Sequence, residues 1–180
     1  VFAPLLGFAG STTIAIVTND LGTTGTGGAL TDTDSLGVTV VNLIPTLTSI
    51  ATLTGDAEDA DFTITYAALA AAANEADANN DVVTFRVDSV GVGSTLMKNG
   101  FGVIPGLTTL GVNEFWVWRG PANVNGVLAG FAVRVFDGID VSSPPVTVKI
   151  DVAPQPDAPT LSLVSTLPGA FINGPAINNI

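Results

Sequence analysis

The chain has 180 residues, with 16 Asp and Glu against 5 Lys and Arg, a formal net charge of −11, and neither Cys nor His. Disulfide frameworks, thiolate zinc sites, cysteine nucleophiles and serine–histidine–aspartate triads therefore lack their essential atoms. Five basic side chains cannot neutralise a phosphate backbone, so we expect no nucleic-acid partner.

The surface is expected to be unusually apolar. Only 12% of the residues are charged and 47% are hydrophobic, whereas soluble domains carry about 25% charged residues. No apolar run approaches the ~20 residues that span a bilayer, and the longest candidate, residues 1–9, is interrupted by Pro4 and Gly7. We therefore predict no membrane insertion and expect the apolar surface to be packed against copies of the same chain.

Short segments rich in β-branched and aromatic residues predict strands along nearly the whole chain. They are residues 13–18, 37–41, 46–53, 62–66, 82–87, 115–118, 131–136 and 146–152. Alternation in 131–136 places Phe131, Val133 and Val135 on one face and Arg134 on the other. An Asn-Gly pair at 99–100 predicts a tight hairpin, and residues 66–74 predict one short helix that crosses beside a sheet. Many short strands with frequent turns indicate an all-β sandwich.

The most informative feature is an internal repeat. Residues 45–55 read PTLTSIATLTG and residues 159–169 read PTLSLVSTLPG, with six of eleven positions identical. The offset from position 45 to position 159 is 114 residues, the size of one sandwich domain. A second match aligns 14–22 with 132–138, followed in each copy by a Val-Thr-Val strand at 38–40 and 146–148.

This repeat predicts the domain organisation. Residues 1–44 are expected to be the last strands of a partial repeat, 45–158 one complete repeat, and 159–180 the first strand or strands of a further repeat. Incomplete sheets leave unpaired backbone edges, which pair with any strand that is offered.

Several motifs in sequence order resemble bacterial cadherin-like tandem repeats of large extracellular adhesins. They are GTGGALTDTD at 25–34, the Glu58-Asp59 pair, EADANND at 75–81, PANVNG at 121–126 and DAPTLS at 157–162. The resemblance implies an immunoglobulin/cadherin-like β-sandwich, an extracellular or bacterial cell-surface location, structural or adhesive work, and calcium at repeat junctions. The first junction departs from the pattern because it has Asn42 but no Asp before Pro45, so it is expected to be poor in metal or free of it.

Two acidic loops supply candidate calcium ligands. Glu75, Asp77, Asn79 and Asp81 lie at alternate positions, a spacing similar to that of oxygen-donor loops for Ca²⁺; the alternative is a solvated polar loop. Asp137 and Asp140 could join this group, or Asp137 could only cap a turn with Gly138.

In the second loop, Asp56, Glu58, Asp59 and Asp61 place four carboxylates within six residues. The resemblance implies that Glu58 faces the next linker and Asp157, and the alternative is an acidic turn in water. The predicted calcium ligands are Glu58, Asp59, Asp77, Asn79, Asp81, Asp137 and Asp157.

Trp116 and Trp118 are two residues apart on a predicted strand and share one face. We favour a place in the core, as is usual for a sandwich tryptophan. An exposed pair would instead indicate a sugar-stacking platform for a cell-surface glycan. If the tryptophans lie in the core, Phe115 and Val117 make the opposite face of the strand apolar as well. That face is then expected to be covered by a crossover or by a neighbouring subunit.

We expect no enzyme activity, because the only remaining catalytic route is a carboxylate pair in a cleft and no groove is evident. The leading hypothesis is a structural subunit of an extracellular bacterial fibre or surface array, joined head to tail by β-strand complementation between subunits. Residues 158–165, with 170–180 as a further candidate, would pair with the strands of 1–44 in the next copy. The expected assembly residues are Thr160, Leu161, Leu163, Val164, Ile14, Ile16, Val38 and Val40. The alternatives are a monomeric stalk repeat of a large calcium-dependent adhesin and a carbohydrate-binding module.

Overall fold

The computed structural model describes residues 2–5, 7–23 and 25–157. The further partial repeat at 159–180, with its expected assembly residues Thr160, Leu161, Leu163 and Val164, lies outside the described residues.

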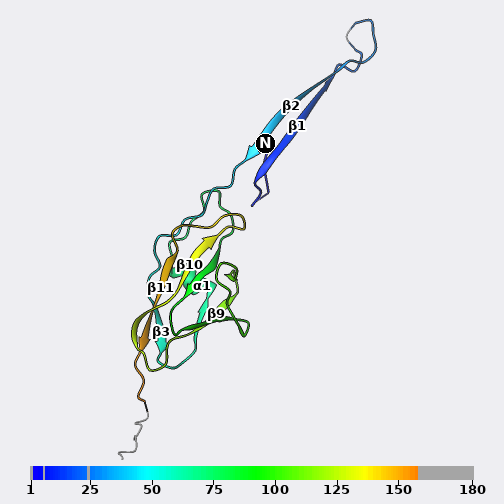
Figure 1. Cartoon of the computed structure of the whole chain (residues 1–180). Helices are drawn as coiled ribbons and strands as arrows, with labels where there is room; N and C mark the ends of the chain where they lie inside the picture. The colour runs from blue at the N-terminus through cyan, green and yellow to red at the C-terminus, as the bar shows by residue number, and fades with distance from the viewer. Residues whose placement is uncertain (1, 6, 24, 158–180) are drawn as a thin grey trace, which may run out of the picture.

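The described chain is all-β, and two packed sheets form its main body, here called the sandwich (Figure 1). One sheet has the strand order β3-β11-β10-β5-β8 and the other β4-β9-β6-β7. The strands of the first sheet are β3 Leu53–Ala57, β5 Thr84–Val90, β8 Thr109–Leu110, β10 Gly126–Phe136 and β11 Val146–Ala153. Those of the second are β4 Phe62–Thr65, β6 Thr95–Lys98, β7 Phe101–Gly102 and β9 Phe115–Arg119.

Alternating side chains from both sheets form one core. Phe131, Val133 and Val135 of β10 are at most 2% exposed, which confirms the face predicted for them. Arg134 lies on the other face, where its Nε is 2.7 Å from Asp88 Oδ1. The predicted all-β class is therefore confirmed.

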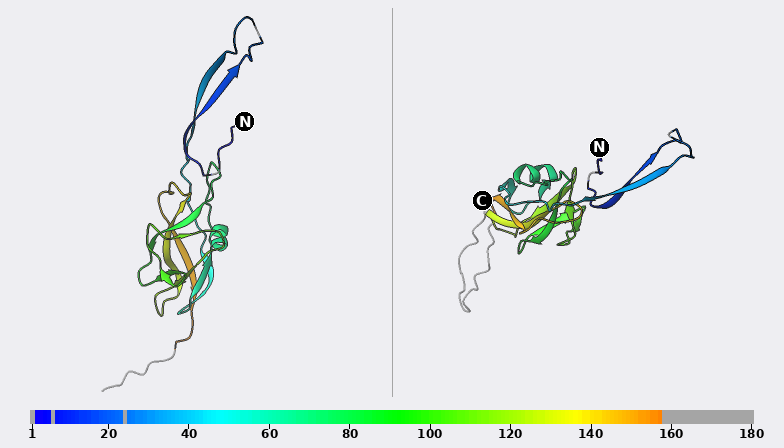
Figure 2. Two further views of the ribbon diagram at one scale, coloured as in Figure 1. Left: turned by 90° about the vertical axis from the view of Figure 1, so that its right-hand side faces the viewer. Right: turned by 90° about the horizontal axis from the view of Figure 1, so that it is seen from above.

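A single short helix connects the two sheets, as predicted. Helix α1 (Tyr66–Ala72) follows β4 of one sheet and precedes β5 of the other, and Figure 2 shows it at the side of the sandwich. The Thr65 hydroxyl accepts a hydrogen bond from Ala68 N, which caps the helix. Leu69 is fully buried and fixes the helix against the core.

The strand predicted at 46–53 is wrong. Only isolated bridges form there, Thr46 with Ala76 and Ile50 with Ala73, and β3 begins at Leu53. The Asn74 amide oxygen accepts hydrogen bonds from the backbone N–H groups of Thr48 and Ser49. A side chain thus takes the place of a neighbouring strand. The predicted Asn-Gly hairpin is confirmed, since Asn99 and Gly100 both have positive φ between β6 and β7.

A long hairpin projects from one end of the sandwich (Figures 1 and 2). It consists of β1 (Gly10–Asn19) and β2 (Thr31–Val40), which form a two-stranded sheet of their own. The segment that follows β11, orange in Figure 1, leaves the sandwich at the opposite end. The hairpin and the C-terminal exit therefore lie at opposite poles.

The strand register supports the repeat and corrects its alignment. The 114-residue offset takes Thr12 to Gly126 and Val38 to Val152, and both pairs face each other across their hairpins. The neighbouring pairs, up to Ala15 opposite Ser35 and Ala129 opposite Lys149, follow from the same register. At the 114-residue offset the hairpin thus has the strand register of β10–β11. The strand register contradicts the alignment of 38–40 with 146–148 and of 14–22 with 132–138. Those sequence matches need offsets other than 114 residues, and β10 contains a register shift between Ala129 and Phe131.

Glycine is required where β5 ends against β10. A Cβ at Gly91 would collide with the carbonyl oxygens of Ala129 and Gly130, both of which are backbone atoms. We expect Gly91→Ala to lower the free energy of unfolding by about 2–3 kcal/mol, measured by urea denaturation. Gly102→Ala in β7 is the control, since no atom lies within 4 Å of its Cβ position. Equal stability of the two variants would contradict this packing.

Candidate functional site

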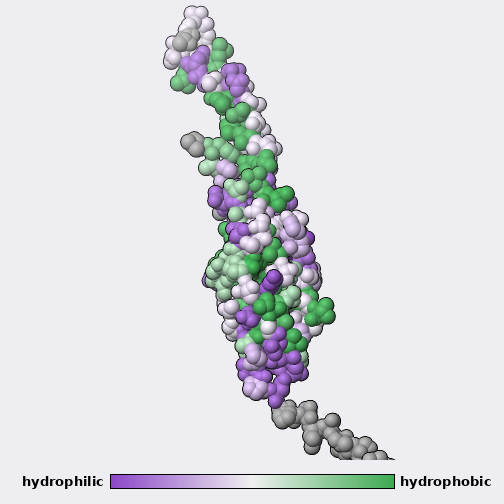
Figure 3. All heavy atoms as spheres, turned by 90° about the vertical axis from the view of Figure 1, so that its left-hand side faces the viewer, coloured by the Kyte–Doolittle hydropathy of each residue, from purple (hydrophilic) through white to green (hydrophobic). Residues whose placement is uncertain are grey.

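The β1–β2 hairpin carries an apolar face without cover among the described residues. Ile14 faces Leu36 across the hairpin, and Ile16 and Val38 lie on the same face, which also carries Asp34 opposite Ile16. Ile16 is 50% and Leu36 57% exposed. Figure 3 shows apolar residues along the projecting hairpin.

The corresponding residues of the sandwich are core residues. Leu36 and Val38 correspond to Ile150 and Val152, which are at most 3% exposed, whereas Asp34 stands at the position of the buried Val148. The hairpin thus repeats a core-forming strand pair without the opposing sheet that buries it in the sandwich. Burying such side chains contributes about 25 cal/mol per Å², so this face favours association.

Both long edges of the hairpin also lack partners among the described residues. In the sandwich, β10 pairs with β5 and β11 pairs with β3, whereas β1 and β2 pair only with each other. Unpaired edges are templates for an added strand. Of the expected assembly residues, Ile14, Ile16, Val38 and Val40 lie on this hairpin.

Polar contacts attach the hairpin to the sandwich. Asn42 Nδ2 donates to Asp137 Oδ2 and Asp140 Oδ2, both at 3.0 Å. Gly7 N donates to Asp81 Oδ1 at 2.7 Å, and Leu43 N donates to Asn79 Oδ1 at 3.2 Å. The structure therefore brings Asn79, Asp81 and Asp137 of the predicted calcium ligands to this junction.

The junction carboxylates have protein donors as partners. Asp137 Oδ1 accepts from the backbone N–H groups of Ile139 and Asp140, and Asp77 Oδ1 accepts from those of Asn79 and Asp81. The pKa of Asp137 lies below its usual value: burial raises it, but the hydrogen bonds from Asn42 and the backbone outweigh that effect. Asn42 supplies a neutral amide between two carboxylates, where a cation would otherwise offset their repulsion.

Three buried oxygens near this junction lack hydrogen-bond partners: Asn42 Oδ1, Asp77 Oδ2 and Glu75 Oε2. Burial raises the pKa of Glu75. Oxygen donors of this kind suit Ca²⁺, but within the part of the chain that the structure describes no three acidic residues are grouped so that they could hold a metal ion. The side chains as placed do not form a calcium cage, and calcium stays a prediction of the resemblance.

At the opposite pole, Glu58 contacts the outgoing linker. Its Oε2 accepts hydrogen bonds from Gln155 N at 3.1 Å and from Asn125 Nδ2 at 3.4 Å. Asp59 accepts from Asn123 N, and a rotated Asn123 amide donates to Asp157. Amide groups again stand beside the carboxylates, and they attach the outgoing linker to the sandwich.

Both tryptophans lie in the core. Trp116 and Trp118 are fully buried, Trp118 Nε1 donates to Gly130 O, and Trp116 packs edge to face on Phe131. The favoured interpretation as core residues is confirmed, and neither ring offers a surface to a sugar. Phe115 on the outer face of β9 is 45% exposed, so no crossover of the described chain fully covers that side.

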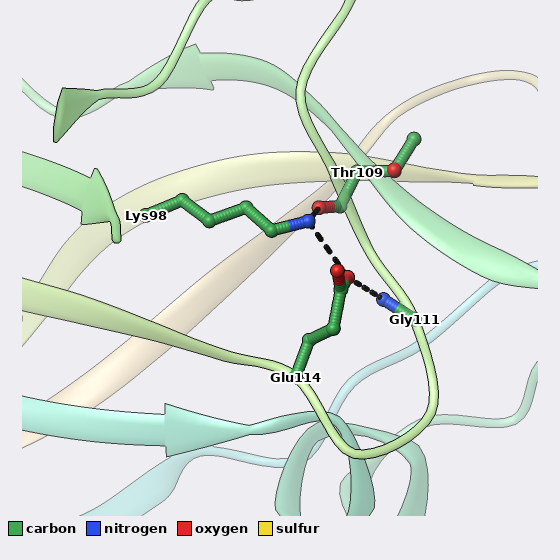
Figure 4. A network of polar contacts seen from close by, with 4 residues as sticks. All are labelled: Lys98, Thr109, Gly111 and Glu114. Carbon is green, nitrogen blue, oxygen red and sulfur yellow. Dashed lines mark hydrogen bonds and ion pairs between the residues drawn. The ribbon is translucent and has the colours of Figure 1, made fainter. Parts of the chain in front are cut away.

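Lys98 and Glu114 form a polar clamp at one end of the second sheet (Figure 4). Lys98 Nζ lies 2.7 Å from Glu114 Oε2 and 2.7 Å from Thr109 O, and Glu114 Oε2 also accepts from Gly111 N. The hydrogen bond from Lys98, followed by that from Gly111, lowers the pKa of Glu114. The clamp ties β6 to the loop that precedes β9.

A surface hollow lies at the hairpin tip. It is lined by residues that include Asp20 and Asp32. Hydrogen bonds from the backbone N–H groups of Gly22 and Leu30 lower the pKa of Asp20. Asp20 thus serves to order the turn.

None of the helical structure in the described residues is long and apolar enough to span a membrane.

Comparison with solved structures gives a weak likeness. No family model and no curated protein matches the chain. An endo-fucoidan hydrolase from glycoside hydrolase family 107 aligns with a TM-score of 0.38 and 17% identity, over 82% of this chain and 19% of that one. The chain thus spans about a fifth of that enzyme's length, and a likeness at this level supports no statement about fold family or activity.

Replacing Asn42 tests the junction. In Asn42→Asp, a third carboxylate would face Asp137 and Asp140 in place of an amide donor. Loss of hydrogen bonds to charged groups should cost about 1–3 kcal/mol, observed as a lower Tm in low salt that added salt partly restores. Asn80→Asp adds the same charge at an exposed position nearby and should change the Tm little. A Tm equal to wild type for Asn42→Asp would refute the contact.

The clamp predicts a pH dependence. A carboxyl with a lowered pKa stabilises the fold above its ordinary pKa of 4.5, and this stability disappears as the pH falls through the lowered value. Glu114→Gln should therefore be less stable at pH 7, by under about 1 kcal/mol because the group is partly exposed. Thermal melts should show this difference vanishing in acid. Lys149→Met, at an exposed site, should show no such trend.

Proposed function

We propose that the chain is a structural unit of an extended extracellular bacterial array, in which neighbouring units complete the sheet that β1 and β2 begin. In its leading form, the neighbour is another copy of the chain, and the array is a fibre built head to tail. The proposal assigns no catalytic reaction.

One observation carries the proposal: a hairpin equivalent in register to β10–β11 exposes residues whose counterparts are buried. Leu36 is 57% exposed, while its counterpart Ile150 is fully buried. The position of the hairpin supports the same conclusion, because it projects at the pole opposite to the C-terminal exit (Figure 1). Contacts between opposite poles propagate without closing on themselves, and this produces a filament.

A stalk repeat of a large adhesin is the second candidate. The matching register of two hairpins 114 residues apart favours it, because tandem repeats in one polypeptide have this property. In that case the strands that cover the hairpin belong to the same polypeptide. Adhesion, surface location and calcium dependence are further proposals from the resemblance.

Sedimentation and negative-stain microscopy of the purified chain test the leading form. We expect end-to-end particles that lengthen with concentration. Leu36→Asp places a charge on the apolar hairpin face and should weaken association at least about tenfold, since burial of an unpaired charge is costly. Val17→Asp is the matched control on the opposite face of the same hairpin, where Val17 is 62% exposed.

A chain that stays monomeric at all concentrations would contradict the proposed fibre and would leave the stalk repeat as the remaining candidate. Equal association of both variants would remove the hairpin face from the contact.

A further inference from the structure

We propose that residues 159–171 of a second copy complete the hairpin sheet by adding a strand parallel to β2. This inference rests on the proposed function and names the segment and register of the contact. It follows from what the same sheet edge does inside the sandwich.

Within the sandwich, the outer edge of β11 is paired by β3. The two strands are parallel, with Ile150 opposite Leu53 and Val152 opposite Asp56. The 114-residue offset places Leu36 and Val38 at the positions of Ile150 and Val152. The outer edge of β2 is thus the counterpart of an edge that accepts a parallel strand.

The repeat also identifies the strand. The same offset takes β3 (Leu53–Ala57) to residues 167–171, which read LPGAF. Gly55 has a φ of +102°, a conformation that favours glycine, and the offset places a glycine, Gly169, at the same position. Pro168 stands at the position of Thr54. The pairing of β3 with β11 shifts register next to Thr54, and proline is tolerated at such an irregularity of an edge strand. The expected pairs are Leu36 with Leu167 and Val38 with Ala170.

The segment also supplies side chains for the apolar face. Leu47 and Leu53 are buried in the sandwich core, and their counterparts are Leu161 and Leu167. Residues 158–180 contain no charged side chain, so the segment adds no repulsion toward a chain of net charge −11. Its apolar residues match the exposed Ile16 and Leu36 in chemistry.

This register moves the pairing strand along the chain. The sequence alone assigned the pairing to residues 158–165, with 170–180 as a further candidate. Within the counterpart of 158–165, Thr46 and Ile50 form bridges to Ala76 and Ala73, not to β11. Leu163 corresponds to the exposed Ser49, and so should face away from the hairpin.

Disulfide trapping tests the register, since the chain has no native cysteine. Full-length Val38→Cys is mixed with full-length Ala170→Cys that carries a mass tag, and the mixture is oxidised. Only a contact between copies yields the mixed dimer. We expect at least about tenfold more of it than from Val38→Cys with Leu163→Cys, the matched control.

A second measurement does not depend on cysteines. Gly169→Val, at the counterpart of Gly55, should weaken self-association at least about tenfold, because valine does not favour the positive φ of Gly55, while Gly174→Val should not. Association that survives Gly169→Val, or trapping that is equal for both pairs, overturns the register and leaves the proposed fibre standing. A chain that never self-associates overturns both.

Discussion

Burial of alternate strand residues between two sheets is the interaction on which this structure depends. In the sandwich it places Phe131, Val133 and Val135 against the tryptophans of β9, with side chains at most 2% exposed. The hairpin has the same strand register but no opposing sheet among the described residues. The same sequence pattern therefore stabilises the fold in one place and favours association in the other.

Amide groups organise the two poles. Asn42 bridges Asp137 and Asp140 at one pole, and Asn125 contacts Glu58 at the other. An amide donates hydrogen bonds to carboxylates without adding charge, so it relieves part of the repulsion in a strongly acidic chain. These contacts attach both linkers to the sandwich and fix the directions in which neighbouring units would continue.

Much of the fold could be predicted because the local signals are strong. Alternation located β4, β9, β10 and β11, and the Asn-Gly pair located the β6–β7 turn. The segment 46–53 looked like a strand, but it forms only isolated bridges, and the backbone N–H groups of Thr48 and Ser49 donate to the side chain of Asn74, a contact that no periodicity encodes. β3 was missed because Gly55 and Asp56 lower its strand propensity.

The candidate site was predictable in part. Ile14, Ile16 and Val38 could be placed on an open strand pair from the repeat, whereas Leu36 and the true register needed the paired strands. The role of Asn42 was not foreseen, since the contact spans 95 residues to Asp137. Sequence spacing alone cannot show which distant amide reaches a carboxylate.

The parallel pairing of β3 with β11 has a mechanical consequence. These are the first and last strands of the sandwich, and they lie side by side in the same direction. A pulling force applied to the two ends of the sandwich would load this pair in shear, so its ladder hydrogen bonds would have to break together. Hydrogen bonds that are loaded together in shear resist extension better than hydrogen bonds that break one after another. Such resistance is a property that the proposed array would require of its units.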